Sequence, residues 1–194
     1  EKKQWSDEHV EVAQIMTDMK EGVPVYELPD VSTYDIAVTR ESKPSKFVEI
    51  YFLGTIRNGM VWNMTLSTPP CSIQIIPSKS EYRGSGVQCV VGFNFFQPES
   101  CPNFEKFLLH IKHLSDKLKD RFTLLKKDTT KWMDPLRRDR TVIVGVKVKI
   151  RNSNLEQLVV ARRVFNVAVI GINMVYISKE RAGMVLDLLD AQPI

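Results

Sequence analysis

Three cationic side chains, Lys147, Lys149 and Arg151, alternate with apolar residues near the middle of the second half of the chain. In a β-strand alternate residues share a face, so these cations would stand in a row, roughly 7 Å apart. The opposite face would carry only Val and Ile and would pack into a core. A row of charges suits an extended polyanion better than one small anion, because the charge is spread rather than focused.

The row belongs to a broadly basic part of the chain. Residues 117–163 contain fourteen basic and five acidic residues, whereas the net charge of all 194 residues is only +4. The remainder is therefore acidic, and much of its negative charge lies in the first 35 residues. This asymmetry indicates an anionic partner for the second half, and nucleic acid fits it better than a small substrate.

Aromatic residues lie among these cations. Binding of single-stranded nucleic acid needs flat side chains for the bases as well as cations for the phosphates. Each charge alone would also suit a solvated surface and each aromatic a core, so the joint pattern carries the prediction. The nucleic-acid-binding residues that we predict are Arg57, Trp62, Lys79, Tyr82, Arg83, Lys126, Lys127, Lys131, Trp132, Arg137, Arg138, Lys147, Lys149 and Arg151.

The sequence contains no complete motif for metal binding or for catalysis. His110 and His113 are three residues apart in a predicted helix, on the edge of its polar face, but no further ligand completes a metal site. There is no Gly-x-Ser-x-Gly elbow and no phosphate-binding glycine loop, and Cys89 lies within an apolar segment typical of a core. We therefore expect no catalytic residue, no metal and no cofactor, and a protein that is not an enzyme.

The cysteines and the hydropathy indicate the compartment. Three widely spaced cysteines argue against a disulfide scaffold and for an intracellular, reducing environment. No apolar run approaches the roughly 18 to 20 residues that span a bilayer, so we expect no membrane partner.

The chain divides near residue 30. Residues 6–21 have helical spacing of apolar side chains, with Ser6 as a cap and Gly22 as a stop, and Pro24 and Pro29 mark a linker. We predict an acidic N-terminal helix and linker at residues 1–30 and a single β-rich domain at residues 31–194. The acidic segment could occupy the basic surface, in which case deleting residues 1–30 would tighten binding.

The domain alternates short strands with one long helix. Asn58-Gly59 predicts a type I′ hairpin turn, and apolar residues at three-to-four spacing predict an amphipathic helix at residues 102–122. The fold class that follows is α+β, mostly β: an antiparallel OB-like barrel with one long amphipathic helix and a short N-terminal helix. The predicted strands are residues 34–40, 46–54, 60–68, 71–76, 87–96, 141–151, 158–169, 174–178 and 184–190.

The order of these elements resembles a known family. It runs through Leu66-Ser67-Thr68-Pro69, Phe93-Asn94-Phe95, a helix with Phe104, Leu108 and Leu114, Trp132 with Pro135-Leu136, Val146-Lys147-Val148-Lys149-Ile150, Val175-Tyr176-Ile177-Ser178 and Gly183-Met184-Val185-Leu186. This layout is similar to the single-stranded DNA-binding proteins of large eukaryotic DNA viruses, which use an oligonucleotide-binding (OB) barrel with an inserted helix. Some such proteins carry an acidic tail, whereas this sequence ends in Asp-Ala-Gln-Pro-Ile.

The resemblance implies sequence-independent binding and protection of single strands in viral DNA replication and recombination. Phosphates would lie along the cation row and the Arg137-Arg138 pair, and bases would stack on Trp132, Tyr82 or Trp62. It also implies single-stranded DNA as partner, with RNA as an alternative, together with self-association and replication proteins. The place of action would be the host nucleus or a cytoplasmic replication site.

Two other readings remain open. A viral matrix or capsid protein with a basic genome- or membrane-facing surface would share the strand-rich composition, and would form multimers without nucleic acid. A binder of structured RNA would prefer duplexes and depend less on aromatic residues.

Overall fold

The structure is a computed structural model that describes residues 28, 35–40, 47–77 and 86–194. Apart from Leu28, the predicted N-terminal helix and linker lie outside these residues, as do Lys79, Tyr82 and Arg83. The fold is mostly β, with 50% strand, and it combines a closed five-stranded barrel with one long helix. The predicted α+β class is confirmed at this level.

The barrel closes through hydrogen bonds around a ring of five strands. Their order is β5–β6–β8–β10–β9, and β9 returns to β5. We predicted an antiparallel barrel, but β8 and β10 run parallel, with Asp187 beside Lys149. They can do so because a helix and the whole of β9 separate them along the chain. The strands are β5 (Cys71–Ile75), β6 (Val87–Phe93), β8 (Val142–Ile150), β9 (Val164–Ser178) and β10 (Ala182–Pro193).

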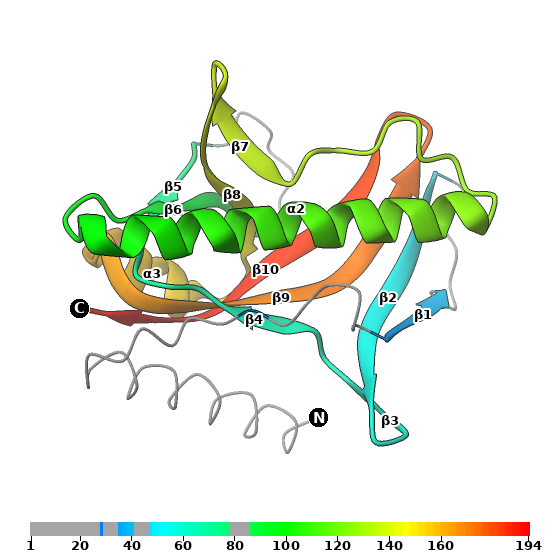
Figure 1. The fold of residues 1–194 in the computed structure, drawn as a ribbon, viewed down its shortest axis with the longest axis horizontal. Coiled ribbons are helices and arrows are strands. Elements are labelled where there is room, and N and C mark those ends of the chain that lie inside the picture. Colours follow the sequence, from blue (N-terminus) through cyan, green and yellow to red (C-terminus); the bar gives the residue numbers. More distant parts are fainter. Residues whose placement is uncertain (1–27, 29–34, 41–46, 78–85) are drawn as a thin grey trace.

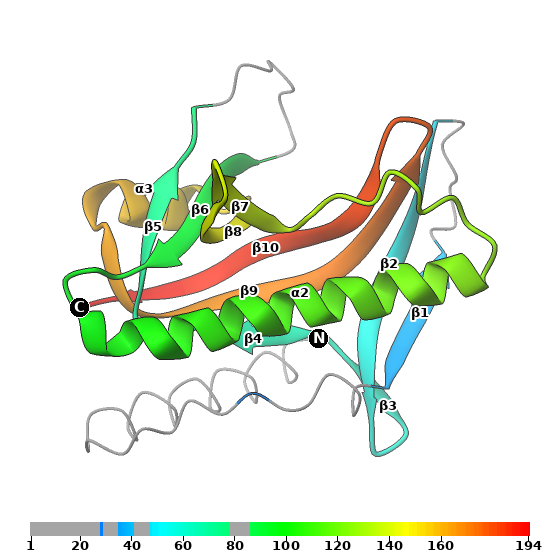
Figure 2. The ribbon, with the colours of Figure 1, turned by 45° about the horizontal axis from the view of Figure 1, so that its top comes forward.

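The β9–β10 hairpin extends well beyond the barrel, as Figures 1 and 2 show. The edge of β9 opposite β10 pairs in turn with β5, β4 and β2, so one strand serves both the barrel and its extension. Residues 60–68, predicted as one strand, form two, because β3 pairs with β2 whereas β4 pairs with β9. The added strands are β1 (Ile36–Arg40), β2 (Val48–Arg57), β3 (Met60–Trp62) and β4 (Thr65–Ser67).

The turn between β2 and β3 is of the predicted kind. Asn58 and Gly59 have φ values of 51° and 74°, so both occupy the left-handed region that a type I′ turn requires. The turn sets Arg57 opposite Met60 and fixes the register of this hairpin.

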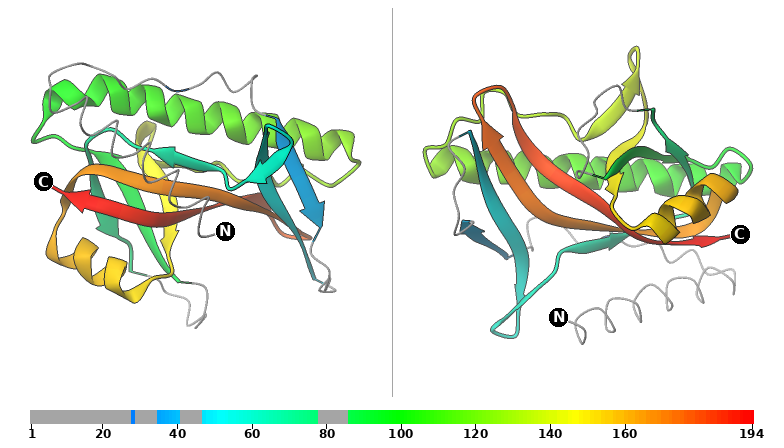
Figure 3. Two further views of the ribbon diagram at one scale, coloured as in Figure 1. Left: turned by 90° about the horizontal axis from the view of Figure 1, so that it is seen from below. Right: turned by 180° about the vertical axis from the view of Figure 1, so that it is seen from behind.

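The long helix α2 (Cys101–Leu124) confirms the helix predicted at residues 102–122. It runs along the β9–β10 hairpin and covers the core from one side (Figures 1 and 3). His110, expected on the polar face, is 6% exposed and lies on the buried stripe. The apolar residues of that stripe are Phe104, Phe107, Leu108, Ile111, Leu114, Leu118 and Phe122.

A second helix, α3 (Ser153–Ala161), occupies part of the stretch that we predicted as a strand at residues 158–169. The Asn152 side chain caps it by accepting hydrogen bonds from the backbone N–H groups of Asn154 and Leu155, at 2.9 and 3.2 Å. Leu155 and Val159, one turn apart, bury their side chains in the core. The β-branched pair at Val159 and Val160 favoured a strand, but the cap and this burial decide for a helix.

The interior of the barrel contains alternate residues of β8, as predicted. Val146, Val148 and Ile150 are at most 2% exposed. Val142, predicted on the same inner face, is instead 64% exposed, because β8 begins in a hairpin that projects past the barrel. Two thiols, Cys71 and Cys89, are also buried here, and burial raises the pKa of each to about 12.

Candidate nucleic-acid interface

A groove with a cavity volume of about 700 Å³ lies over β8, β9 and β10, between the start of β2 and the segment that precedes β7 (Leu136–Asp139). We call it the basic groove. Five cationic side chains line the groove, together with two carboxylates that belong to exposed loops, so the net charge of its lining is positive. These residues are Lys147, Lys149, Arg151, Lys179, Arg181, Asp134 and Glu180.

The pairing of β8 with its neighbours sets the cation row in this groove. Lys147 lies opposite Val90 of β6, and Lys149 lies opposite Gln88. Both lysines are half-buried, whereas the intervening Val148 points into the barrel. The strand alternation predicted from the sequence therefore holds at this site, and it presents the lysines on the groove side.

Arg151 is anchored at the end of the row. Its Nε lies 3.0 Å from Oδ1 of Asp187, a carboxylate on β10 that is itself only 9% exposed. Burial lowers the pKa of Lys149, and the charges of Arg151 and Arg181 lower it further, whereas Asp187 opposes the shift. Positive charge is thus concentrated in this groove, and an anionic ligand would relieve the repulsion.

The groove also contains the flat and soft side chains that bases require. Tyr176 of β9 lines it, and the guanidinium carbon of Arg181 lies 5.9 Å from the centre of its ring. Burial raises the pKa of Tyr176, and Arg181 opposes that shift. Phe47, which also lines the groove, is 79% exposed. Three methionines add polarizable surface: Met133, Met174 and Met184.

These residues were not among those predicted. A signal existed for Tyr176, because Met174, Tyr176 and Ser178 alternate along one face of a predicted strand. The pattern does not say, however, that this face meets the lysines of β8. That meeting arises from β10, which pairs with β9 on one side and with β8 on the other.

Arg137 and Arg138 extend the cation row onto β7. Arg137 lies opposite Gly145, and therefore on the same face of the sheet as Lys147. Arg138 follows a bulge, and its Nε lies 3.3 Å from Oδ2 of Asp134. Both arginines are exposed. The structure thus brings together five of the predicted residues along one face.

Trp132 occupies a different environment from the one we predicted. Its indole packs against the core beside Phe122, with ring centres 6.4 Å apart. Its Nε1 donates a hydrogen bond to Oγ of Ser115, at 2.9 Å. The ring therefore joins the loop after α2 to the helix, and it does not line the groove.

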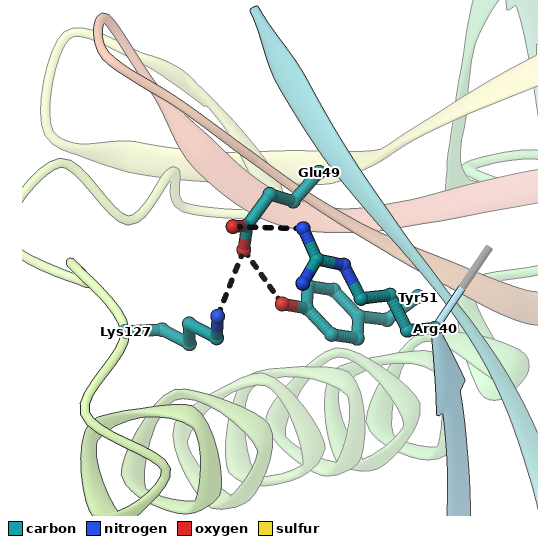
Figure 4. A network of polar contacts seen from close by, with 4 residues as sticks. All are labelled: Arg40, Glu49, Tyr51 and Lys127. Atoms are coloured by element: carbon teal, nitrogen blue, oxygen red, sulfur yellow. Dashed lines mark hydrogen bonds and ion pairs between the residues drawn. The ribbon is translucent and has the colours of Figure 1, made fainter. Parts of the chain in front are cut away.

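Lys127 is part of a polar network on the other side of the sheet, shown in Figure 4. Its Nζ lies 3.2 Å from Oε2 of Glu49, which also accepts a hydrogen bond from the Tyr51 hydroxyl at 2.6 Å. Arg40 completes the network at 3.3 Å from Oε1 of Glu49. These contacts tie the end of α2 to β1 and β2, and they give Lys127 a structural partner.

The remaining predicted residues are dispersed. Lys126 is exposed at the turn after α2, with a φ of 59°. Lys131 is exposed too, and its Nζ donates to the backbone carbonyl of Lys179 in the β9–β10 loop, close to the groove. Arg57 and Trp62 lie on the β2–β3 hairpin, at the opposite end of β2 from the strand start that lines the groove. The structure does not bring these two residues to the groove.

In residues 28, 35–40, 47–77 and 86–194 no group of three His, Cys, Asp or Glu side chains could hold a metal ion. Within the same ranges, no helix has the length and apolar character needed to cross a membrane.

No protein-family model, no curated protein sequence and no solved structure matches this chain.

Proposed function

We propose that this chain binds single-stranded DNA without sequence preference and protects it during replication and recombination of viral DNA. One observation carries the proposal: the basic groove sets a row of cations on β8 beside an aromatic and methionine-rich surface on β9 and β10. Such a pairing of phosphate-binding and base-binding surfaces is what sequence-independent binding of single strands requires.

The position of the groove supports the proposal. The five barrel strands occur along the chain as β5, β6, β8, β9 and β10, and the barrel shape is OB-like. In OB folds, oligonucleotides bind on the second and third strands and on the loops that join strands one to two and four to five. Here these are β6, β8, the loop before β6 and the β9–β10 loop. The groove takes Gln88, Lys147 and Arg181 from this set. The support is an analogy of fold.

In the proposed complex the phosphates lie along Lys147, Lys149 and Arg151, and continue to Arg137. A base stacks on Tyr176, where the Arg181 guanidinium already lies near the ring. None of these contacts reads the edge of a base, so binding is independent of sequence. Each neutralised phosphate releases counterions, so the affinity falls steeply as the salt concentration rises.

The cellular setting is part of the same proposal. A protein that coats exposed strands acts where viral DNA is copied, in the nucleus or at a cytoplasmic replication site. Its partners there are replication proteins and further copies of itself along the strand.

The first experiment measures binding of a fluorescent oligo-dT of about 30 nucleotides, and of a duplex of equal length, at low and high salt. Tight, salt-sensitive binding that favours the single strand supports the proposal. Preference for the duplex would favour a binder of structured RNA. Equal or absent binding, together with multimers that form without nucleic acid, would favour a matrix or capsid protein.

A further inference from the structure

The β7–β8 hairpin rises from the edge of the basic groove. Asp134 and Pro135 line the groove and lead directly into β7, and Lys147 lines it again after the hairpin returns along β8. Figure 1 shows the hairpin projecting away from the barrel and past α2. A strand that leaves the groove along the cation row therefore meets the base of this hairpin.

The β7–β8 hairpin carries cationic side chains but no aromatic residue. Arg137, Arg138 and Arg140 are exposed, and Asp139 is the one carboxylate within residues 136–146. No residue of that range is aromatic, whereas the groove contains Tyr176. The hairpin can hold phosphates, but it has no flat face on which an unpaired base would stack.

Contact with phosphates alone suits double-stranded DNA, whose bases are paired and turned inward. Most hydrogen bonds between proteins and duplex DNA reach the phosphates and sugars. A two-stranded β-ribbon also fits the major groove of B-DNA, which is about 12 Å wide. The groove and the hairpin therefore have different chemistry, one for unstacked bases and the other for a paired duplex.

We propose that the β7–β8 hairpin binds the duplex arm of a junction whose single-stranded arm lies in the basic groove. This inference rests on the proposed function and names its substrate more closely: a duplex with a single-stranded tail. Arg137 and Arg138 lie at the boundary between the two arms, and Arg140 at the tip of the hairpin reaches furthest along the duplex.

The test compares three fluorescent DNAs at one salt concentration: an oligo-dT of about 15 nucleotides, a duplex of about 15 base pairs with that oligo-dT as a tail, and the blunt duplex. The unmodified protein should bind the tailed duplex about threefold to tenfold more tightly than oligo-dT, because extra phosphates are neutralised. The blunt duplex should bind most weakly.

A double variant of the hairpin tip, Arg140→Asn with Val142→Glu, isolates its role. Arg140 has a φ of 56°, which asparagine tolerates, and Val142 is 64% exposed, so the fold should persist. A matched control makes the same charge change at the C-terminal end of α3, with Arg162→Asn and Val160→Glu, where Val160 is 67% exposed. Only the hairpin variant should lose the preference for the tailed duplex, and both should keep the affinity for oligo-dT.

The outcomes separate the two proposals. If the unmodified protein binds tailed duplex and oligo-dT equally, or if the hairpin variant keeps the preference, the hairpin does not hold the duplex. If the protein binds no oligo-dT at all, the proposed function itself fails. If both double variants lose the preference, the effect comes from net charge, and the assignment to the hairpin is wrong.

Discussion

The indole Nε1 of Trp132 donates a hydrogen bond to Oγ of Ser115, 2.9 Å away and only 2% exposed. The bond joins the loop after α2 to the middle of that helix. A tryptophan among lysines suggests base stacking from sequence alone, yet this ring is held against the core. Its role is thus structural, whereas Tyr176 lines the basic groove and is the residue on which we propose that a base stacks.

Substitution of Trp132 should therefore lower the stability of the fold, whereas substitution of Tyr176 should weaken DNA binding. Trp132→Phe leaves the Ser115 hydroxyl without its donor and should lower the free energy of unfolding by about 1 to 3 kcal/mol, with unchanged affinity for oligo-dT. Tyr176→Leu keeps apolar volume but removes the flat ring, and should weaken oligo-dT binding by about 1 to 3 kcal/mol. Urea unfolding and fluorescence anisotropy measure the two effects. A large loss of affinity in Trp132→Phe would return the stacking role to Trp132.

The cation row makes a quantitative prediction about salt. In Lys147→Gln with Lys149→Gln, two phosphate contacts disappear, so the slope of log K against log salt should become shallower by about 1.4. The matched control is Arg162→Gln with Arg163→Gln, which removes two exposed charges between α3 and β9. An unchanged slope in the lysine variant would show that phosphates do not lie along β8.

The network at Glu49 predicts how stability depends on pH. The hydrogen bond from Tyr51, opposed by burial and aided by Lys127 and Arg40, holds the pKa of Glu49 below its ordinary value of 4.5. Because the folded pKa is lower than the unfolded one, this stabilisation is complete above the unfolded pKa and is lost as the pH falls through the folded pKa.

Glu49→Gln should therefore lower the free energy of unfolding by roughly 1 kcal/mol at neutral pH, after allowance for solvent screening. The difference from the unmodified protein should shrink as the pH falls below about 4. Glu105→Gln, at an exposed position of α2, is the control. It should change neither the free energy of unfolding at neutral pH nor the dependence of that free energy on pH. A difference that stays constant down to low pH would mean that the ionised carboxylate is not the stabilising group.

The acidic N-terminal segment should compete with DNA for the basic groove. Deletion of residues 1–30 would also remove Leu28, which packs against the core, so charge substitution is the cleaner test. Asp7→Asn, Glu8→Gln, Glu11→Gln and Asp18→Asn together should tighten oligo-dT binding about threefold or more at low salt, with a smaller effect at high salt. Equal affinities at low salt would exclude this competition.

Local signals in the sequence predicted much of the fold. The Asn58-Gly59 turn, the apolar stripe of α2 and the alternation of Lys147 and Lys149 on β8 all follow from backbone geometry and periodicity. The sequence did not predict the helix α3, because the β-branched residues Val159 and Val160 are typical of a strand. Asn152, a residue type that often caps helices, was the signal for a helix at this place.

The candidate site was harder to predict, since periodicity shows which residues share a face but not what covers that face. For Trp132, the sequence did not show that α2 covers its indole. For Tyr176, the sequence did not show that β10 pairs with both β9 and β8 and so brings this residue near the lysines of β8. Both depend on pairings between segments that are distant in the chain.

The pairing of β9 with β10, β5, β4 and β2 has a consequence for synthesis of the protein. The ribosome makes β9 and β10 after every other described element, yet the barrel ring and the cover of α2 both need them. Until these strands emerge, the barrel ring cannot close, and the apolar stripe of α2 and the inner face of β8 lack part of the surface that buries them. We therefore expect a nascent chain that ends before β9 to be sensitive to protease, and protection to appear once β9 and β10 are available for pairing.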